Sequence, residues 1–288
     1  MHYTAPQSVN EMFHALSQAG ESAKIIAGGT DLIVQMRAGT LRPTLIVDLK
    51  HLPLADIRED STSVTVGARV THTQLADSEV IRRHFPALAA ACRLVGGPAT
   101  RNRGTLGGNI MNASPAADAL PPLAIYDAHM VIASRTENRS VSFQDFFVGY
   151  RRTAVPPHEF LQEVRLVKPS ALSASEFIKQ GLRRALHIAT VNVAARVDVD
   201  TAGVVCAARI ALGSVAPVIV RARAAEEFLL AKRLTPDTID AAARRVIDAA
   251  SPISDLRASG AYRKATLAVL ARRALTSICT QLGESAHV

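Results

Sequence analysis

The chain has 288 residues, of which 48% are hydrophobic and 20% charged, a composition typical of a globular protein with about two domains. The formal charge is +8, but only 4% of the residues are aromatic and none is Trp, so nucleic-acid binding is not expected. No apolar run approaches the roughly 18 residues of a membrane helix, and the N-terminus lacks a secretory signal pattern, so a cytoplasmic protein is expected.

The start of the chain predicts a compact β-α-β unit. A short strand over residues 24–27 runs into Gly28 and Gly29, and a helix follows over residues 32–37 with Thr30-Asp31 as its cap. Residues 44–48 then read as another strand. Strand, glycine turn, helix and strand in this order indicate an α/β arrangement.

A second α/β unit is predicted up to about residue 170. Between its halves lies the polar stretch of residues 100–118, rich in glycine and asparagine, which reads as a long loop with two interpretations. It either crosses the surface or wraps a ligand with many hydrogen-bonding oxygens. Strands are expected over residues 64–68, 130–133, 141–143 and 160–167, and helical segments over residues 71–75 and 87–95.

The C-terminal part predicts a small antiparallel sheet with helices. Lys168-Pro169-Ser170 is the best candidate linker. Beyond it, residues 189–199 and 204–215 are long β-branched segments around a polar turn, which predicts a hairpin. Helices are expected over residues 222–231, 236–250 and 262–282. The fold class is therefore α+β, with an N-terminal domain over residues 1–170, divided near residue 52, and a C-terminal domain over residues 171–288.

Two glycine-rich segments could hold an anionic ligand. One runs from Ile25 to Asp31 around Gly28-Gly29, and the other from Thr105 to Asn109 around Gly107-Gly108. Glycines let a ligand approach the backbone, and consecutive N–H groups stabilise phosphate oxygens. Neither segment is G-x-G-x-x-G and no P-loop pattern occurs, so neither a Rossmann site nor a P-loop is supported. Taken alone, each glycine pair could equally be an ordinary tight turn.

The second segment continues into Ser114-Pro115-Ala-Ala-Asp118. A carboxylate has no favourable contact with a diphosphate without a metal, so the partners of Asp118 would be sugar or ribityl hydroxyls. Glycine segments together with such an aspartate fit a nucleotide with a polyol, such as FAD. In the alternative interpretation Asp118 caps the next helix. The same spacing recurs at Ser251–Asp255 without a preceding glycine segment, so Asp255 is assigned a structural role.

Several separated motifs, in the same order, resemble those of the FAD-binding medium subunit of molybdenum hydroxylases, the family that includes the flavoprotein components of carbon monoxide and xanthine dehydrogenases. The resemblance extends over nearly the whole chain. It rests on residues 27–32, 105–109 and 114–118, and also on residues 67–73, 177–181, 188–193, 255–257 and 259–263.

The resemblance implies a two-subdomain FAD-binding fold of the vanillyl-alcohol oxidase type, with FAD extended between the subdomains. In it, Asp118 would contact a hydroxyl, Leu161 would pack against the cofactor, and Lys179 would stabilise negative charge on reduced flavin. Without the resemblance, Lys179 would be assigned as an exposed lysine on an edge strand. Arg101 and Arg103 could face the cofactor, a partner subunit or water. The two walls of the cofactor cleft would be formed by Ile25, Ile26, Ala27, Gly28, Gly29, Thr30 and Asp31, and by Thr105, Gly107, Gly108 and Asn109.

The resemblance also implies an electron-transfer subunit without catalytic acid or base. Electrons would arrive from two [2Fe-2S] clusters on a small subunit, substrate would be hydroxylated on a large molybdopterin subunit, and NAD⁺ or another acceptor would be reduced. A dimer of heterotrimers is expected. The widely spaced Cys92, Cys206 and Cys279 offer no ligands for a metal or a further cluster on this chain. Two alternatives stay open: a stand-alone FAD-dependent oxidoreductase of the same fold, and a cofactor-free assembly protein.

Overall fold

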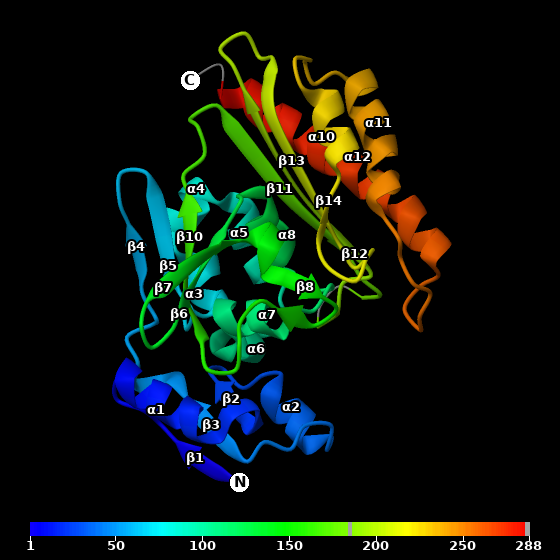
Figure 1. The fold of residues 1–288 in the computed structure, drawn as a ribbon. Helices are drawn as coiled ribbons and strands as arrows, with labels where there is room; N and C mark the ends of the chain where they lie inside the picture. The colour runs from blue at the N-terminus through cyan, green and yellow to red at the C-terminus, as the bar shows by residue number, and fades with distance from the viewer. Residues whose placement is uncertain (184–185, 286–288) are drawn as a thin grey trace.

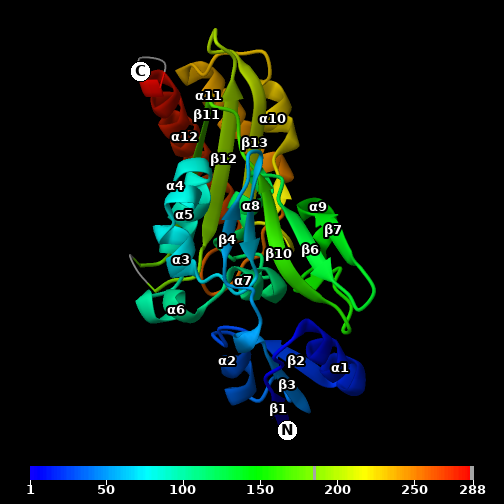
Figure 2. The same cartoon turned by 90° about the vertical axis from the view of Figure 1, so that its left-hand side faces the viewer.

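The structure is a computed structural model that describes residues 1–183 and 186–285. Its N-terminal part forms a separate lobe at one end of the molecule, and the C-terminal helices lie toward the other end (Figure 1). Beyond the lobe, two sheets alternate with two groups of helices, and the C-terminal helices form the outer layer, as the view turned by 90° also shows (Figure 2). No helix in the described parts of the chain is long and apolar enough to span a membrane.

The N-terminal lobe is built on a three-stranded parallel sheet of order β1-β3-β2, and the predicted β-α-β order is confirmed. Met12 and Leu16 lie at helical spacing and are buried against Val47 and Leu49. This helix begins after Ser8, whose Oγ accepts a hydrogen bond from the N–H of Glu11. The elements are β1 (His2–Thr4), α1 (Val9–Ala19), η1 (Gly20–Ser22), β2 (Ala23–Ile26), α2 (Leu32–Arg37), β3 (Leu45–Asp48) and η2 (Leu49–His51).

The middle region contains a five-stranded antiparallel sheet of order β4-β5-β10-β6-β7. Its last strand in sequence, β10, takes the central position. The strands are β4 (Ile57–Glu59), β5 (Ser63–Gly67), β6 (His129–Ala133), β7 (Asn138–Ser142) and β10 (Phe160–Val167), and a separate hairpin is formed by β8 (Phe147–Gly149) and β9 (Arg152–Thr153).

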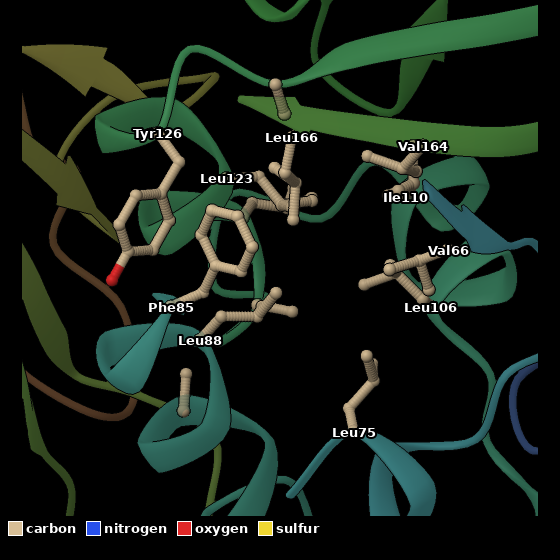
Figure 3. Packing of buried hydrophobic residues seen from close by; sticks show 14 of the residues in the cluster. Val66, Leu75, Phe85, Leu88, Leu106, Ile110, Leu123, Tyr126, Val164 and Leu166 are labelled. Carbon is tan, nitrogen blue, oxygen red and sulfur yellow. The ribbon is translucent and has the colours of Figure 1, made fainter. Parts of the chain in front are cut away.

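Short helices cover this sheet and fill the largest core. Phe85 and Tyr126 pack edge to face with ring centroids 5.0 Å apart, above Val66, Val164 and Leu166 of the sheet (Figure 3). Burial of these side chains joins helices that are too short to be stable alone. They are α3 (His72–Asp77), α4 (Glu79–His84), α5 (Pro86–Arg93), α6 (Pro98–Arg103), α7 (Leu106–Asn112), α8 (Leu120–Ile125) and α9 (Phe143–Phe146).

The polar stretch of residues 100–118 is therefore not a long loop, because it contains most of α6 and all of α7. Thr105 caps α7, since its Oγ1 accepts a hydrogen bond from the N–H of Gly108 at 3.0 Å. Leu106 and Ile110, four residues apart, are fully buried in the core. Their burial outweighs the low helix propensity of the intervening glycines.

The C-terminal part is a four-stranded antiparallel sheet of order β11-β12-β13-β14, in which the predicted hairpin is confirmed as β12–β13. Helices α10, α11 and α12 cover one face (Figure 1), while α5 and α8 contact the other. The elements are β11 (Ser173–Gln180), β12 (Val191–Val199), β13 (Val205–Gly213), β14 (Val220–Arg221), α10 (Arg223–Leu229), α11 (Pro236–Arg245), η3 (Val246–Ala249) and α12 (Gly260–Ser285).

The core of the middle region continues into this C-terminal sheet. Phe177 of β11, Ala194 of β12 and Ala211 of β13 belong to the same buried cluster as Phe85. A division of the chain near residue 170 consequently does not coincide with a gap in the packing, and the proposed domain boundary stays a prediction.

Candidate functional site

A cleft of about 680 Å³ lies where the N-terminal lobe meets the middle region. This volume is within the roughly 300–1,000 Å³ range of small-molecule sites. One wall comes from β2 and the turn before α2, and the other from α7 and the segment that leads into β10. The cleft brings together Ile25, Ile26, Ala27, Gly28, Gly29, Thr30, Asp31, Thr105, Gly107, Gly108, Asn109 and Leu161, which are all of the predicted site residues except Asp118 and Lys179.

The turn over residues 28–31 presents a row of backbone donors. Gly29 has a φ of 73°, a left-handed conformation that favours glycine. The carbonyls of Gly29 and Asp31 accept hydrogen bonds from the N–H groups of Ile33 and Gln35, whereas none of the N–H groups of residues 28–31 donates to an acceptor in the described chain. Consecutive N–H groups of this kind form a concave site for an anion.

Because Gly28 has no side chain, the two walls of the cleft can pack closely at this position. A Cβ at this position would lie 1.9 Å from the carbonyl oxygen of Arg103 at the end of α6. Gly107 is similar, because its Cβ would lie 2.6 Å from the carbonyl oxygen of Ala68. Both glycines were expected to let a ligand approach the backbone. Both line the cleft, but the space left by each missing Cβ is occupied by another segment of the chain.

The second wall differs chemically from the first. The N–H of Gly107 donates to the carbonyl of Ala68 at 2.9 Å, and the N–H of Asn109 donates to the carbonyl of Thr105 at 3.0 Å. Since the N–H of Gly108 is taken by the Thr105 hydroxyl, these groups are already satisfied. What this wall offers is the Oδ1 atom of Asn109, which is buried and has no hydrogen-bond partner in the described chain. A ligand hydroxyl or N–H would satisfy it.

Asp118 and Lys179 form a buried ion pair outside the lining of the cleft. Lys179 Nζ lies 2.6 Å from Asp118 Oδ2, and their side chains are 1% and 8% exposed. Lys179 also donates to the carbonyls of Leu94 at 3.1 Å and His187 at 2.9 Å, while Asn192 Nδ2 donates to Asp118 Oδ1 at 3.3 Å. The interpretation of Lys179 as an exposed lysine is therefore wrong.

The structure also tests the alternative interpretation of Asp118 as a helix cap. Burial raises the pKa of Asp118 to about 6, although the cation of Lys179 acts in the opposite direction. Helix α8 is capped at Ala119 without a side-chain hydrogen bond, so Asp118 is not a helix cap. A second cavity of about 380 Å³ lies beside Lys179 and is lined by Leu94, whose chain neighbour Val95 lines the cleft.

Several polar residues of the cleft were not identified from the sequence, and His72, Asn112 and Arg151 are among them. His72 is 2% exposed, and burial, assisted by the charge of Arg101, lowers its pKa to about 4, so its ring is neutral at neutral pH. His72 lies in residues 67–73, one of the segments that carry the family resemblance, so the sequence could have identified it. Asn112 lies in the polar stretch of residues 100–118, but neither it nor Arg151 was singled out as a site residue, and the fold brings both to the cleft.

The two arginines of uncertain role have different surroundings. Arg101 donates from Nη1 to the carbonyls of Val95 at 3.2 Å and Gly96 at 3.3 Å, and so holds the turn before α6. Arg103 is exposed, and it is its backbone carbonyl that contacts Gly28. Residues 1–183 and 186–285 contain no group of three or more His, Cys, Asp or Glu side chains placed to hold a metal ion.

Comparison with known proteins agrees with this fold and cleft. Residues 1–169 match the family described as the FAD binding domain in molybdopterin dehydrogenase, and residues 176–278 match the CO dehydrogenase flavoprotein C-terminal domain. The chain is 32% identical to the carbon monoxide dehydrogenase medium chain of Hydrogenophaga pseudoflava, with 96% of each chain covered. It is 33% identical to the nicotinate dehydrogenase FAD-subunit of Eubacterium barkeri, with 97% of this chain and 96% of that protein covered.

Solved structures show the same likeness. Quinoline 2-oxidoreductase from Pseudomonas putida 86 matches with a TM-score of 0.92 and 31% identity, and 98% of each chain is covered. The fold and the cleft therefore define a flavoprotein subunit that binds FAD. Within that class, the chain belongs to the family of FAD-binding medium subunits of molybdenum hydroxylases, which are components of oxidoreductases.

Proposed function

We propose that this chain is the electron-transfer subunit of a molybdenum hydroxylase. It receives electrons from [2Fe-2S] clusters of a small partner subunit and delivers them to NAD⁺ or another acceptor, while substrate is hydroxylated on a large molybdopterin subunit. The named relatives, a medium chain and an FAD-subunit of dehydrogenases, support this role over nearly the full length of the chain. When bound, FAD supplies the redox group, and the protein binds and orients it.

The row of unpartnered N–H groups at residues 28–31 carries the proposal. These groups bind the diphosphate of FAD, because they are consecutive, belong to residues that line the cleft and have no acceptor within the described chain. On the second wall, the buried Oδ1 of Asn109 accepts a hydrogen bond from the cofactor. Leu161 packs against it as an apolar surface. The donor set of the cleft thus fits a dinucleotide without a metal.

Asp118 and Lys179 are assigned to the flavin end of the cofactor. The second cavity beside Lys179 supports this assignment, because its residue Leu94 adjoins the cleft residue Val95. Lys179 holds a positive charge there, and Asp118 keeps that side chain in place through their 2.6 Å contact. A fixed cation beside a flavin favours its reduced, anionic form.

The absorption spectrum of the purified protein tests the proposal. We expect a yellow protein whose flavin bands survive gel filtration and whose flavin is released as FAD on denaturation. A folded, colourless protein that takes up no added FAD would show that the chain is a cofactor-free assembly protein instead.

Amide hydrogen exchange tests the two walls separately. FAD should slow exchange at residues 28–31 strongly, because these N–H groups have no acceptor without it. Exchange at residues 107–109 should change little, since these N–H groups are already hydrogen-bonded. Equal protection of both segments would contradict the assignment of the diphosphate to the first wall.

Co-purification tests the proposed assembly. A tagged copy of the chain is expected to co-purify with a large and a small subunit. The mass of the complex, measured by light scattering, is expected to be that of a dimer of heterotrimers. Isolation of a lone subunit that acts on its own substrate would instead favour a stand-alone oxidoreductase.

A further inference from the structure

Arg151 occupies an unusual turn at the edge of the cleft. It lies between β8 and β9 with a φ of 51°, in the left-handed region that residues other than glycine seldom adopt. The residue is exposed, yet its side chain lines the cleft. Nη1 of Arg151 donates to Oδ1 of Asn112 at 3.2 Å. The turn thus directs a permanent positive charge toward the ligand space.

Asn112 connects this charge to the row of N–H groups. Its Nδ2 donates to Oδ1 of Asp31 at 3.2 Å, and the N–H of Asp31 is the last of the row at residues 28–31. Arg151, Asn112 and Asp31 come from three separate segments and from both walls of the cleft. The guanidinium is therefore two side-chain contacts away from the donors that hold the diphosphate.

A cation at this place would offset the carboxylate of Asp31 beside a bound diphosphate. A diphosphate on residues 28–31 would lie beside the carboxylate of Asp31, which repels it. Lys24 and Arg151 are the cationic side chains among the described residues that line the cleft. Lys24 Nζ donates to the carbonyl of Glu21 at 3.3 Å, whereas Arg151 is joined to Asp31 through Asn112. Burial raises the pKa of Asp31 and the charge of Arg151 opposes that rise, so the two side chains interact.

We infer that Arg151 is a phosphate-binding residue, which supplies the cationic contact to the FAD diphosphate held by the N–H groups of residues 28–31. Its guanidinium offers two parallel donors to phosphate oxygens, a geometry that lysine does not reproduce. The inference rests on the proposed function and adds to it the residue that offsets the Asp31 carboxylate.

The test measures the dissociation constant of FAD for the full-length chain after its flavin has been removed. Binding is monitored by the quenching of flavin fluorescence, at low and at high salt. Arg151→Gln should weaken FAD binding about tenfold at low salt, in line with loss of a charge-assisted hydrogen bond. The salt dependence of the dissociation constant should become shallower, because one screened charge contact is gone. Arg151→Lys should recover part of the affinity.

Arg152→Gln is the matched control, since this neighbouring arginine is exposed and does not line the cleft. It should bind FAD like the wild type. The inference is overturned if Arg151→Gln binds FAD within about twofold of the wild type. It is also overturned if the loss of affinity is the same at low and high salt, which indicates a structural role. Failure of the wild type to bind FAD would instead overturn the proposed function, and this inference with it.

Discussion

Single residues of the site owe their chemistry to burial. His72 is neutral because it is enclosed. Lys179 is enclosed as well, and Asp118 and two carbonyls surround its Nζ atom. Neither property can be read from neighbouring residues in the sequence. Both have measurable consequences for the free energy of unfolding.

The first consequence concerns His72 and pH. Its folded-state pKa of about 4 lies below the ordinary value of 6.5, so as pH falls between these values the unfolded chain binds a proton that the folded chain does not. The stability that neutral His72 contributes above pH 6.5 is therefore lost progressively as the pH falls toward 4. Over this interval the wild type should lose roughly 3 kcal/mol more unfolding free energy than His72→Gln. Denaturant unfolding at several pH values checks this, and identical pH profiles would contradict it.

The second consequence concerns the buried pair. Lys179→Met leaves the Asp118 carboxyl enclosed without its cation, which should cost roughly 3–5 kcal/mol of unfolding free energy in the flavin-free protein. The double variant Asp118→Asn/Lys179→Met should be less destabilised than the sum of the single changes. The exposed Lys264→Met is the control and should unfold like the wild type. A flavin-free Lys179→Met protein of normal stability would assign Lys179 to the cofactor alone.

At the scale of elements, α7 shows how a helix forms over a glycine pair. Thr105 supplies the cap, and the burial of Leu106 and Ile110 supplies the packing. The same helix carries Asn109 to the cleft. The geometry of the second wall therefore depends on the first turn of α7.

Removal of this cap should affect stability and binding together. Thr105→Ala frees the N–H of Gly108 and should cost about 1 kcal/mol of unfolding free energy. It should also weaken FAD binding, because Asn109 closes the same first turn, with its N–H donating to the carbonyl of Thr105. Thr235→Ala removes the corresponding cap of α11, which does not line the cleft, and should cost a similar amount of stability without weakening FAD binding. Equal FAD affinities for both variants would show that α7 is positioned by its core contacts alone.

At the scale of the whole molecule, the cleft exists because the N-terminal lobe docks on the end of α6. Gly28 makes this contact possible, since its Cα faces the carbonyl of Arg103. A Cβ added to Gly28 would meet backbone atoms, so no side-chain rotation could relieve the clash. The contact also sets the distance between the two walls.

Gly28→Ala should therefore separate the lobe from the middle region. Overpacking costs typically about 1–3 kcal/mol, and the close approach of 1.9 Å to backbone places this change at the upper end. FAD affinity should fall as well. The control is Gly283→Ala in α12, where nothing lies within 4 Å of the added Cβ, and its stability should be unchanged or raised by up to about 1 kcal/mol. Wild-type stability of Gly28→Ala would mean that the lobe docks differently.

The sequence by itself determined the local elements and the kind of ligand. Apolar patterning predicted the β-α-β start and the β12–β13 hairpin, because each depends on residues close together in the chain. The glycine segments and the family resemblance indicated FAD, and the cleft unites most of the proposed residues. The predictions of local elements needed only contacts between near neighbours in sequence, and the FAD prediction needed only motifs that the sequence itself displays.

Only the tertiary structure decided the rest. The pairing of Asp118 with Lys179, the central position of β10 and the contact of Gly28 with Arg103 all join segments far apart in sequence. The helical state of residues 106–112 depended on core burial that the local glycines concealed. The reason is common to all four: burial and close approach are set by partners that a local pattern does not contain.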